Sequence, residues 1–396
     1  MIEKLIFIPY QDSDDFLMSG ILTREYAMLY MINKELNIKD IINIKKPRTE
    51  LDGKRYLVKD ELFPKGTIEE SAKEIIFNSV TIQYKPIISL NQILNRRAWW
   101  QDGYDKTIQL IKQLKLDYSK CIVYSNNPFA YKLIKFLYNN GAKVYFDAMD
   151  NFAIHPSLNN KEHKIAFEGY KVCSKNNNCF SVNSVQTQNY MKGNFKINVE
   201  LVKNGIFPNN SSNIGICNLR QYSILKSKSL EYKKVIGYIG KIGKRIDEQL
   251  VDNISNNSKD CLFVFIGPYL KGQTNEHLLK LFDERKNILH LESISSAYVL
   301  DFLNEFDILM IPHAIGKAEN GGDPLKLYQY LSTEKPIITT EILGVNEFKH
   351  VLYISNKSEE WIDFINNPLL LNEKREIQEF EWITRFSPIL EIIKKW

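Results

Sequence analysis

The sequence predicts an α/β protein with two domains, each built on a parallel sheet covered by helices. Short apolar runs rich in β-branched residues alternate with longer helical stretches along the whole chain, which is the pattern of parallel sheets with helical crossovers. The length of 396 residues exceeds what one hydrophobic core usually serves. A segment rich in turn residues at 204–213 separates two series of strands, and we expect the domain boundary there.

The first domain is expected over residues 1–204. Its clearest strands are the apolar runs at 5–10, 121–125, 143–146, 179–182 and 199–202. Residues 40–118 form its least regular part and show no repeat.

The second domain is expected over residues 205–382 and begins with a polar connector at 209–231. Its strands are expected at 235–239, 262–266, 288–291, 308–311, 336–339 and 351–354. Apolar residues recur at helical spacing in 383–396, so we predict a terminal helix that packs back on the first domain.

Composition and charge exclude several classes of protein. Hydrophobic residues make up 44% of the chain, and no apolar run approaches the roughly 18 to 20 residues of a membrane-spanning helix. The N-terminus lacks the features of a signal peptide, so we expect a cytoplasmic protein. A net charge of +5 is too small for a dedicated nucleic-acid binder but suits an anionic ligand or membrane face. The five cysteines form no C-x-x-C pair, which favours reduced thiols over a disulfide framework or a zinc site.

A loop and helix start at 319–332 is suited to binding an anion. Gly321 and Gly322 let the backbone approach a ligand closely, and Pro324 suits the first turn of a helix. The unpaired N–H groups of such a helix start attract anions, and Lys326 adds a positive charge where a diphosphate would lie. The alternative is an ordinary glycine turn with a surface lysine.

Other strand ends of the second domain also carry basic, small or polar residues. Lys241, Lys244 and Arg245 follow the strand at 235–239, beyond the carboxyl end where open α/β sheets bind ligands. Gly267-Pro268 and the run 292–295 follow the next two strands, and together with the loop at 321–326 these three strand ends can line one crevice. The glycines at 237, 240 and 243 do not form G-x-G-x-x-G, which disfavours a nicotinamide cofactor and a dehydrogenase. A solvated basic loop is the alternative.

The first domain offers its best catalytic candidates after the strand at 143–146. Asp147 and Asp150 follow that strand directly, at the edge that faces the second domain. A carboxylate there can act as a general base. His155 is a rival base because its ordinary pKa lies near neutral pH. Alternatively, the aspartates cap the next helix.

The order of the second-domain motifs resembles the donor-binding domain of GT-B glycosyltransferases, nearest to glycosyltransferase family 4 and related bacterial polysaccharide-biosynthesis enzymes. The matching segments are those at 237–240, 265–268, 306–312 and 324–338. The segments at 180–184 and 199–205 also resemble the approach to the interdomain linker in that family. The resemblance implies two Rossmann-like domains that face each other across a central cleft, with the donor in the second and the acceptor in the first.

The resemblance also implies roles for individual residues. Gly321 and Gly322 would meet the donor sugar and phosphates, Lys326 the diphosphate, and residues around Ile294 the base. Gln329 stands where many relatives carry a ribose-binding glutamate, and the other glutamate of the E-x7-E pair falls on Gly321, so the full motif is absent. The complete set of expected donor-binding residues is Gly240, Lys241, Lys244, Arg245, Gly267, Pro268, Ile294, Gly321, Gly322, Asp323, Lys326, Leu327 and Gln329.

The run Asp12-Ser-Asp14-Asp15 superficially resembles the D-x-D metal motif of the other major glycosyltransferase architecture. It follows the first strand of the wrong domain, far from the expected phosphates, so we expect a helix cap or an acceptor-side loop rather than a metal site. Met18 to Gly20, with Thr23 and Arg24, would then line the floor of the cleft.

We therefore predict a metal-independent glycosyltransferase of the hexosyl type that needs no cofactor. The donor would be a UDP- or GDP-sugar, and the acceptor a saccharide or polyprenyl-diphosphate-linked saccharide of a bacterial cell-surface polysaccharide. An aspartate at 150 favours inversion at the sugar, whereas the likeness to family 4 favours retention. The alternatives are a sugar-nucleotide 2-epimerase and a catalytically inactive nucleotide-sugar-binding protein.

Two tryptophan-containing segments suggest contact with the cytoplasmic face of the membrane. Residues 96–100 and 394–396 join basic side chains to tryptophan, a combination that suits a lipid headgroup interface. The alternative is that the tryptophans lie in the core beneath a charged face.

Overall fold

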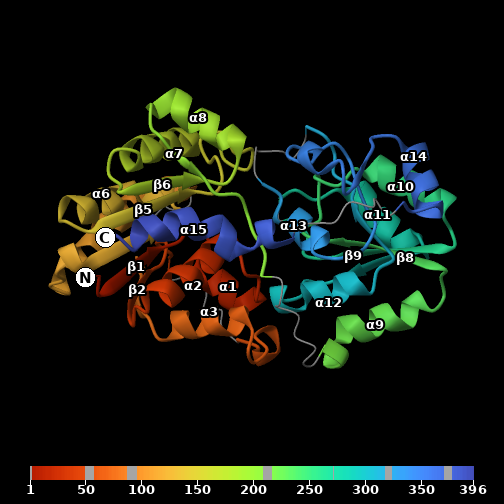
Figure 1. Cartoon of the computed structure of the whole chain (residues 1–396), viewed down its shortest axis with the longest axis horizontal. Coiled ribbons are helices and arrows are strands. Elements are labelled where there is room, and N and C mark those ends of the chain that lie inside the picture. The colour runs from red at the N-terminus through yellow and green to blue at the C-terminus, as the bar shows by residue number, and fades with distance from the viewer. Residues whose placement is uncertain are drawn as a thin grey trace.

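The computed structural model describes residues 2–49, 58–86, 96–207, 216–270, 272–316, 323–369 and 377–396. Within these ranges the chain forms a seven-stranded and a six-stranded sheet, each in its own lobe (Figure 1). Every strand pair in both sheets is parallel, so the carboxyl ends of the strands of each sheet lie along one edge. The prediction of two α/β domains with parallel sheets is therefore confirmed.

The first sheet has the strand order β3-β2-β1-β4-β5-β6-β7. Its strands are β1 (Lys4–Ile8), β2 (Asp40–Ile44), β3 (Val80–Ile82), β4 (Cys121–Ser125), β5 (Lys143–Ala148), β6 (Cys179–Val182) and β7 (Glu200–Leu201). Side chains alternate between its two faces. Leu5 and Phe7 of β1 join one hydrophobic cluster, whereas Ile6 and Ile8 join another, so both faces of this sheet are covered.

The second sheet has the order β10-β9-β8-β11-β12-β13. Its strands are β8 (Lys234–Ile239), β9 (Cys261–Ile266), β10 (Ile288–Leu291), β11 (Ile308–Ile311), β12 (Ile337–Thr339) and β13 (Tyr353–Ile354). In each sheet the chain reverses its direction of strand addition once, between β1 and β4 and between β8 and β11. Open α/β sheets bind ligands beyond the carboxyl ends of strands at such switch points.

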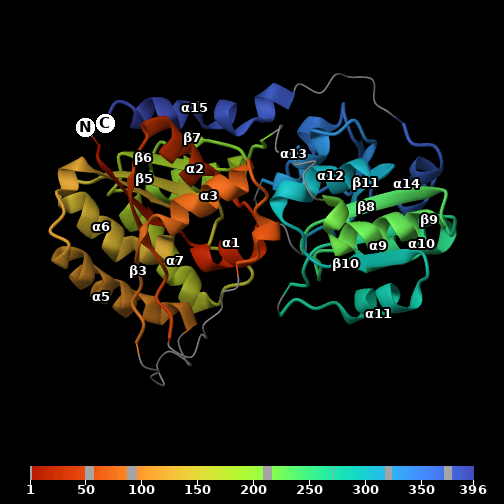
Figure 2. The same cartoon turned by 90° about the horizontal axis from the view of Figure 1, so that it is seen from below.

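Helices cover both sheets (Figures 1 and 2). Those between the strands of the first sheet are α1 (Ser13–Ser19), α2 (Arg24–Leu36), α3 (Ile68–Phe77), α5 (Trp100–Gln113), α6 (Tyr131–Asn139), α7 (Asn160–Cys173) and α8 (Val185–Phe195). The helices that follow are α9 (Arg220–Ser229), α10 (Glu248–Asn257), α11 (Glu276–Glu284), α12 (Val299–Asn304), α13 (Leu325–Leu331), α14 (Ser358–Asn366) and α15 (Trp382–Ile393). None of the described helices has the length and hydropathy needed to cross a membrane.

Helix α15 returns from the second lobe and lies along the first (Figures 1 and 2). Its buried residues Trp382, Phe386 and Ile389 belong to the same hydrophobic cluster as Leu5 and Phe7 of β1. At its C-terminal end, Lys394 pairs with Glu35 at 3.1 Å and Trp396 packs against the same cluster. These terminal residues are therefore engaged within the protein, and they do not support the predicted membrane contact.

The two segments that pass between the lobes lie side by side. The N–H of Ile206 donates to the carbonyl of Phe380 at 2.8 Å, and the N–H of Trp382 donates to the carbonyl of Ile206 at 2.9 Å. Gly205 allows this close approach, because a Cβ there would lie 2.9 Å from the Phe380 carbonyl oxygen. The expected domain boundary falls beside this pairing, and its place between 204 and 205 stays a prediction.

Two regions differ from the sequence-based expectation. Residues 40–118, for which no strand was predicted, contribute β2 and β3 to one side of the first sheet. Part of the expected polar connector is the helix α9, which buries Leu225. The two strands have only five and three residues, and α9 is a mostly polar helix, so its hydrophobic periodicity is weak.

Candidate active site

Asp147, at the end of β5, is fully buried and ion-paired. Its carboxylate accepts hydrogen bonds from Arg24 Nε at 2.8 Å and Arg24 Nη2 at 3.0 Å, and from the Ser181 hydroxyl at 2.6 Å. The side chains of Asp147 and Arg24 are 0% and 4% exposed. Both carboxylate oxygens of Asp147 already accept hydrogen bonds inside the core. Asp147 is therefore placed to hold the end of β5 rather than to accept a proton from a substrate.

This ion pair continues into a polar chain that reaches the second domain. Arg24 Nη1 donates to Asn204 Oδ1 at 3.2 Å, and Asn204 Nδ2 donates to the backbone carbonyl of Asp323 at 2.7 Å. The Asp323 carboxylate accepts from the Asn204 N–H at 2.5 Å and from the Tyr328 hydroxyl at 2.7 Å. Both carboxylate oxygens of Asp323, which was expected to bind the donor, are therefore engaged, one by Asn204 of the first domain and the other by Tyr328 of its own domain.

Asp150 lies just beyond β5 and is half-buried. The Tyr170 hydroxyl donates to its backbone carbonyl at 2.5 Å, which holds this turn in place. Among the described residues, none donates a hydrogen bond to its carboxylate. Loss of water contact raises the pKa of Asp150 to about 6, although the charges of Lys241, Arg24 and Arg245 oppose that rise. Asp150 is thus ionised at neutral pH and basic enough to accept a proton.

A cluster of basic and aromatic side chains from the second domain lies near Asp150. Lys326 Nζ donates to the Tyr238 hydroxyl at 2.7 Å and lies 3.2 Å from His313 Nε2 and 4.0 Å from the centre of the Tyr238 ring. Tyr238 is on β8 and His313 directly follows β11, so the cluster sits at the switch point of the second sheet. Within the described ranges, neither Lys326 nor Arg245 pairs with a carboxylate, and Arg245 Nε is buried without an acceptor.

The electrostatics of this cluster suit an anion. Burial, together with the charges of Arg245 and Lys241, lowers the pKa of Lys326 well below its usual value. Burial and the charges of Lys326 and Arg245 likewise lower the pKa of His313. An anionic group placed among them would stabilise the protonated lysine and supply the missing counter-charge.

The loop after β8 carries Arg245 and is held by backbone hydrogen bonds to its neighbours. The N–H of Ile242 donates to the carbonyl of Pro268 at 2.9 Å, and the N–H of Ala314 donates to the carbonyl of Arg245 at 2.8 Å. Lys244 lines a different cavity with Asp247 and Asn275, one whose lining includes neither Arg245 nor Lys326. Of the three basic residues predicted here, Lys241 and Arg245 are therefore the two that act electrostatically on Asp150.

Two of the predicted glycines are required by close contacts. Gly240 has a φ of +152°, which favours glycine, and a Cβ there would lie 2.6 Å from Lys326 Nζ, so a larger residue would displace the amine. A Cβ on Gly267, whose φ is +146°, would lie 2.1 Å from the Gly240 carbonyl oxygen. Gly267 and Pro268 thus support the loop after β8.

Other predicted donor residues lie away from the cluster. Leu327 is fully buried in the hydrophobic core, so its side chain anchors α13, and its part in donor binding stays a prediction. Ile294, expected near the base of the donor, is buried. The hydroxyl of the neighbouring Ser295 contacts the first domain, where it donates to the carbonyls of Gly20 at 3.0 Å and Leu62 at 2.6 Å. Gln329 lines a cavity of about 50 Å³ between the domains. The predicted positions Gly321 and Gly322 lie outside the described residues.

His155, the rival base, lies in the same turn region as Asp150. Its Nδ1 is 2.7 Å from the Ser157 hydroxyl, and its ring centre is 5.9 Å from that of Phe152. Burial, followed by the charge of Arg97, lowers the pKa of His155 to about 4. The imidazole is neutral at pH 7 and is a weaker base than Asp150.

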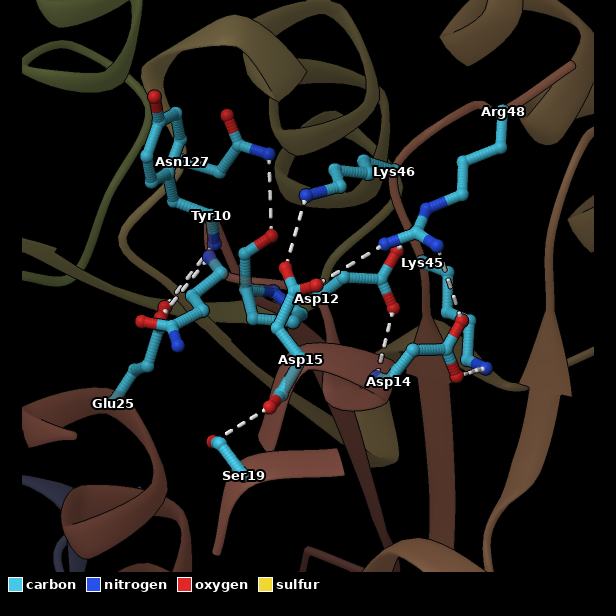
Figure 3. A network of polar contacts seen from close by, with 12 residues as sticks. Tyr10, Asp12, Asp14, Asp15, Ser19, Glu25, Lys45, Lys46, Arg48 and Asn127 are labelled. Carbon is cyan, nitrogen blue, oxygen red and sulfur yellow. Dashed lines mark hydrogen bonds and ion pairs between the residues drawn. The ribbon is translucent and has the colours of Figure 1, made fainter. Parts of the chain in front are cut away.

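The acidic run after β1 forms an ion-pair network (Figure 3). Asp12 accepts a hydrogen bond from the N–H of Asp14 at 3.2 Å and caps α1, as predicted. Arg48 Nε lies 3.3 Å from Asp12 Oδ2, Lys46 Nζ lies 3.3 Å from Asp15 Oδ2, and Lys45 pairs with Asp14. The carboxylates thus face cationic side chains from the segment after β2.

The sequence analysis missed several residues that frame this site. Glu25 is fully buried and accepts hydrogen bonds from the N–H groups of Tyr10 at 3.2 Å and Gln11 at 3.0 Å, which holds the loop after β1 (Figure 3). Trp100 packs against Tyr10 and Phe129, and membrane contact of its segment stays a prediction. The sequence did contain a signal for Tyr10. Tyr10 follows β1 as Asp150 follows β5, and the carboxyl ends of parallel strands lie along one edge of the sheet.

Comparison with known proteins decides the fold. The structure matches that of Anabaena Alr3699/HepE in complex with UDP and glucose with a TM-score of 0.65 and 13% identity, covering 100% of both chains. It also matches an α,α-trehalose-phosphate synthase (UDP-forming) from Burkholderia vietnamiensis with a TM-score of 0.64 and 9% identity, covering 99% of this chain and 98% of that one. The chain has the GT-B fold. The resemblance drawn from its motifs is thus confirmed for the fold.

Sequence comparison adds one relative for this GT-B chain. It is 25% identical over 134 residues to the protein named "Putative teichuronic acid biosynthesis glycosyltransferase TuaH" of Bacillus subtilis (strain 168). The match covers 33% of this chain and 33% of that relative. No family model matches the chain.

Proposed function

We propose that the chain is a glycosyltransferase that moves a hexose from a UDP-sugar to a saccharide acceptor. The observation that carries this proposal is the group formed by Lys326, Arg245 and Lys241, which has no carboxylate partner among the described residues. The charges of Arg245 and Lys241 act on the base Asp150. This arrangement supplies an anion site and a proton acceptor across a domain junction. The structural neighbours crystallised with UDP and the TuaH relative support the choice of donor and reaction.

In the proposed reaction the acceptor hydroxyl attacks the anomeric carbon of the donor sugar. The new carbon–oxygen bond forms as the bond to the diphosphate breaks, the hydroxyl proton passes to Asp150, and UDP leaves with the electron pair. Lys326 and Arg245 stabilise the negative charge that develops on the departing diphosphate. The acceptor is proposed to lie in the first domain, beside Asp150.

A wider role follows from the relative's name. We place the reaction in the synthesis of a bacterial cell-surface polysaccharide, on the cytoplasmic side where nucleotide-sugars are made. Trp100 and Trp396 are partly buried against the protein, and contact of their segments with the membrane stays a prediction.

Donor binding tests the proposal most directly. We expect UDP to bind the wild-type chain and Lys326→Ala to weaken that binding by about 10- to 100-fold, because a hydrogen bond to a charged group contributes about 1.5–3 kcal/mol. Calorimetric titration with UDP and GDP measures the effect. Lys280→Ala, which removes an equal charge from an exposed position on α11, serves as the control. Equal affinity of the wild type and Lys326→Ala for UDP would exclude this donor site.

The pH dependence of transfer should report the ionisation of Asp150. Because the pKa of Asp150 is raised to about 6 and the base must be deprotonated, kcat/KM is expected to fall about tenfold per pH unit below that value and to level off above it. The profile is measured with saturating donor and subsaturating acceptor. An acidic limb that persists unchanged in Asp150→Asn would assign it to another group.

A further inference from the structure

Arg97 comes from the part of the first domain in which the sequence showed no motif. It lies in the short helical turn η3 (Arg96–Trp99), directly before α5. Its guanidinium carbon lies 6.0 Å from the centre of the Tyr10 ring and 5.9 Å from that of Trp100, and both contacts have cation–π geometry. Nη1 donates to Glu162 Oε1 at 3.1 Å. The guanidinium is therefore held by three side chains from different parts of the domain.

The anchor on Glu162 is itself rigid. Glu162 is 1% exposed, and its Oε2 accepts a hydrogen bond from the N–H of Asn159 at 2.9 Å as part of the capping box that begins α7. The Arg97 side chain, in contrast, is 25% exposed. A guanidinium has five N–H donors on three nitrogens, so the contacts with Glu162 and with the Tyr10 hydroxyl leave others available to a ligand.

A series of contacts links Arg97 to the turn that carries the proposed base. The Tyr10 ring that it covers lies 4.2 Å, centre to centre, from the ring of Phe152. The N–H of Phe152 donates to the Tyr170 hydroxyl at 3.2 Å, and that hydroxyl donates to the backbone carbonyl of Asp150. Arg97 thus belongs to the wall of the first domain that adjoins Asp150, on the side proposed to hold the acceptor.

The potential near this wall is positive. His155 packs against Phe152, and the charges that act on its imidazole, from Arg97, Arg245, His163 and Lys241, all lower its pKa. Arg97 contributes to this potential from the first domain, whereas Arg245 and Lys241 contribute from the second. An anionic group between them would be attracted from both sides.

We infer that Arg97 recognises an anionic group on the acceptor saccharide, either a carboxylate or a phosphate. The planar fork of arginine matches both groups and binds them with paired hydrogen bonds. Its anchoring by Tyr10, Trp100 and Glu162 means that little side-chain freedom is lost on binding. The inference rests on the proposed function and extends it by stating that the acceptor carries a negative charge.

The test compares matched charged and neutral acceptors on the full-length chain. Methyl β-D-glucuronide, glucose 6-phosphate and methyl β-D-glucoside are titrated in saturating UDP, so that the donor site cannot capture the anionic probes. We expect the wild type to prefer at least one anionic probe, and Arg97→Gln to weaken binding of that probe by about 10- to 100-fold while leaving the glucoside unchanged. The preferred probe distinguishes a carboxylate from a phosphate.

Two further variants exclude a purely structural effect. Lys106→Gln removes an equal charge from an exposed position on α5 and should behave as the wild type. Arg97→Lys keeps the charge but loses the fork, so it should retain only part of the preference. In turnover assays the substitutions of Arg97 should increase the KM for the acceptor and leave the KM for the donor unchanged.

The outcomes separate this inference from the proposed function. Equal binding of charged and neutral probes by the wild type, or equal loss of both in Arg97→Gln, overturns the role of Arg97 even when UDP binds normally. Failure of UDP to bind overturns the proposed function instead.

Discussion

Replacing Asp150 with asparagine is expected to lower kcat for sugar transfer by about 10²- to 10⁴-fold, the usual contribution of a general base. Asparagine has nearly the same shape but cannot take the acceptor proton. The affinity for UDP should change little, because the proposed diphosphate contacts come from Lys326 and Arg245. The effect is measured as UDP release in the presence of acceptor, and UDP binding is measured in parallel.

The matched control is Asp105→Asn, which makes the same chemical change at an exposed aspartate that pairs with Lys132. It should leave kcat unchanged. Full turnover in Asp150→Asn would mean that the proton leaves by another route, such as an oxygen of the departing diphosphate. Proton NMR of the first product then adds a second readout, because inversion is the outcome expected when Asp150 acts as the base.

The second large effect is expected from Arg24→Met. Removing the arginine leaves Asp147 buried without its counter-charge, and breaking a buried ion pair in this way costs about 3–5 kcal/mol. The free energy of unfolding of the first domain should fall by that amount, with a clear drop in Tm. Because Arg24 also contacts Asn204, its loss removes one link of the polar chain between the domains.

A double variant tests the reason for that loss. Arg24→Met combined with Asp147→Leu removes both charges and should be more stable than Arg24→Met alone, because no unpaired carboxylate remains in the core. Thermal unfolding of the wild type, both single variants and the double variant gives the coupling between the two positions. A double variant as unstable as the sum of the two single ones would show that the pair does not act as a unit.

The fold was largely predictable because its strands are short, apolar and well separated. The predicted strands at 121–125, 179–182, 288–291 and 308–311 have the observed bounds. β3 was missed for a physical reason. β3 has only three residues, and Val80 and Thr81 are exposed, so neither a continuous apolar run nor a clear alternation marks it.

The candidate site was predictable only where its charged residues lie in loops or helix starts that follow a strand of the sheet. Asp150, Arg245 and Lys326 could be found in this way, whereas Arg97 could not, because its place beside Tyr10 and Trp100 depends on tertiary packing. Leu327 follows Lys326 directly, and a one-residue step along a helix turns the side chain by about 100°. Lys326 therefore faces the cluster while its neighbour enters the core.

The return of α15 to the first lobe also bears on how the chain is made. Residues 382–393 leave the ribosome after both sheets have been synthesised, yet they complete the hydrophobic cluster around Leu5, Phe7 and Tyr145. Domains generally fold in the order of synthesis. Here the N-terminal domain keeps an apolar face uncovered until translation of the second domain has finished. The domain that is made first is thus the one whose core is closed last.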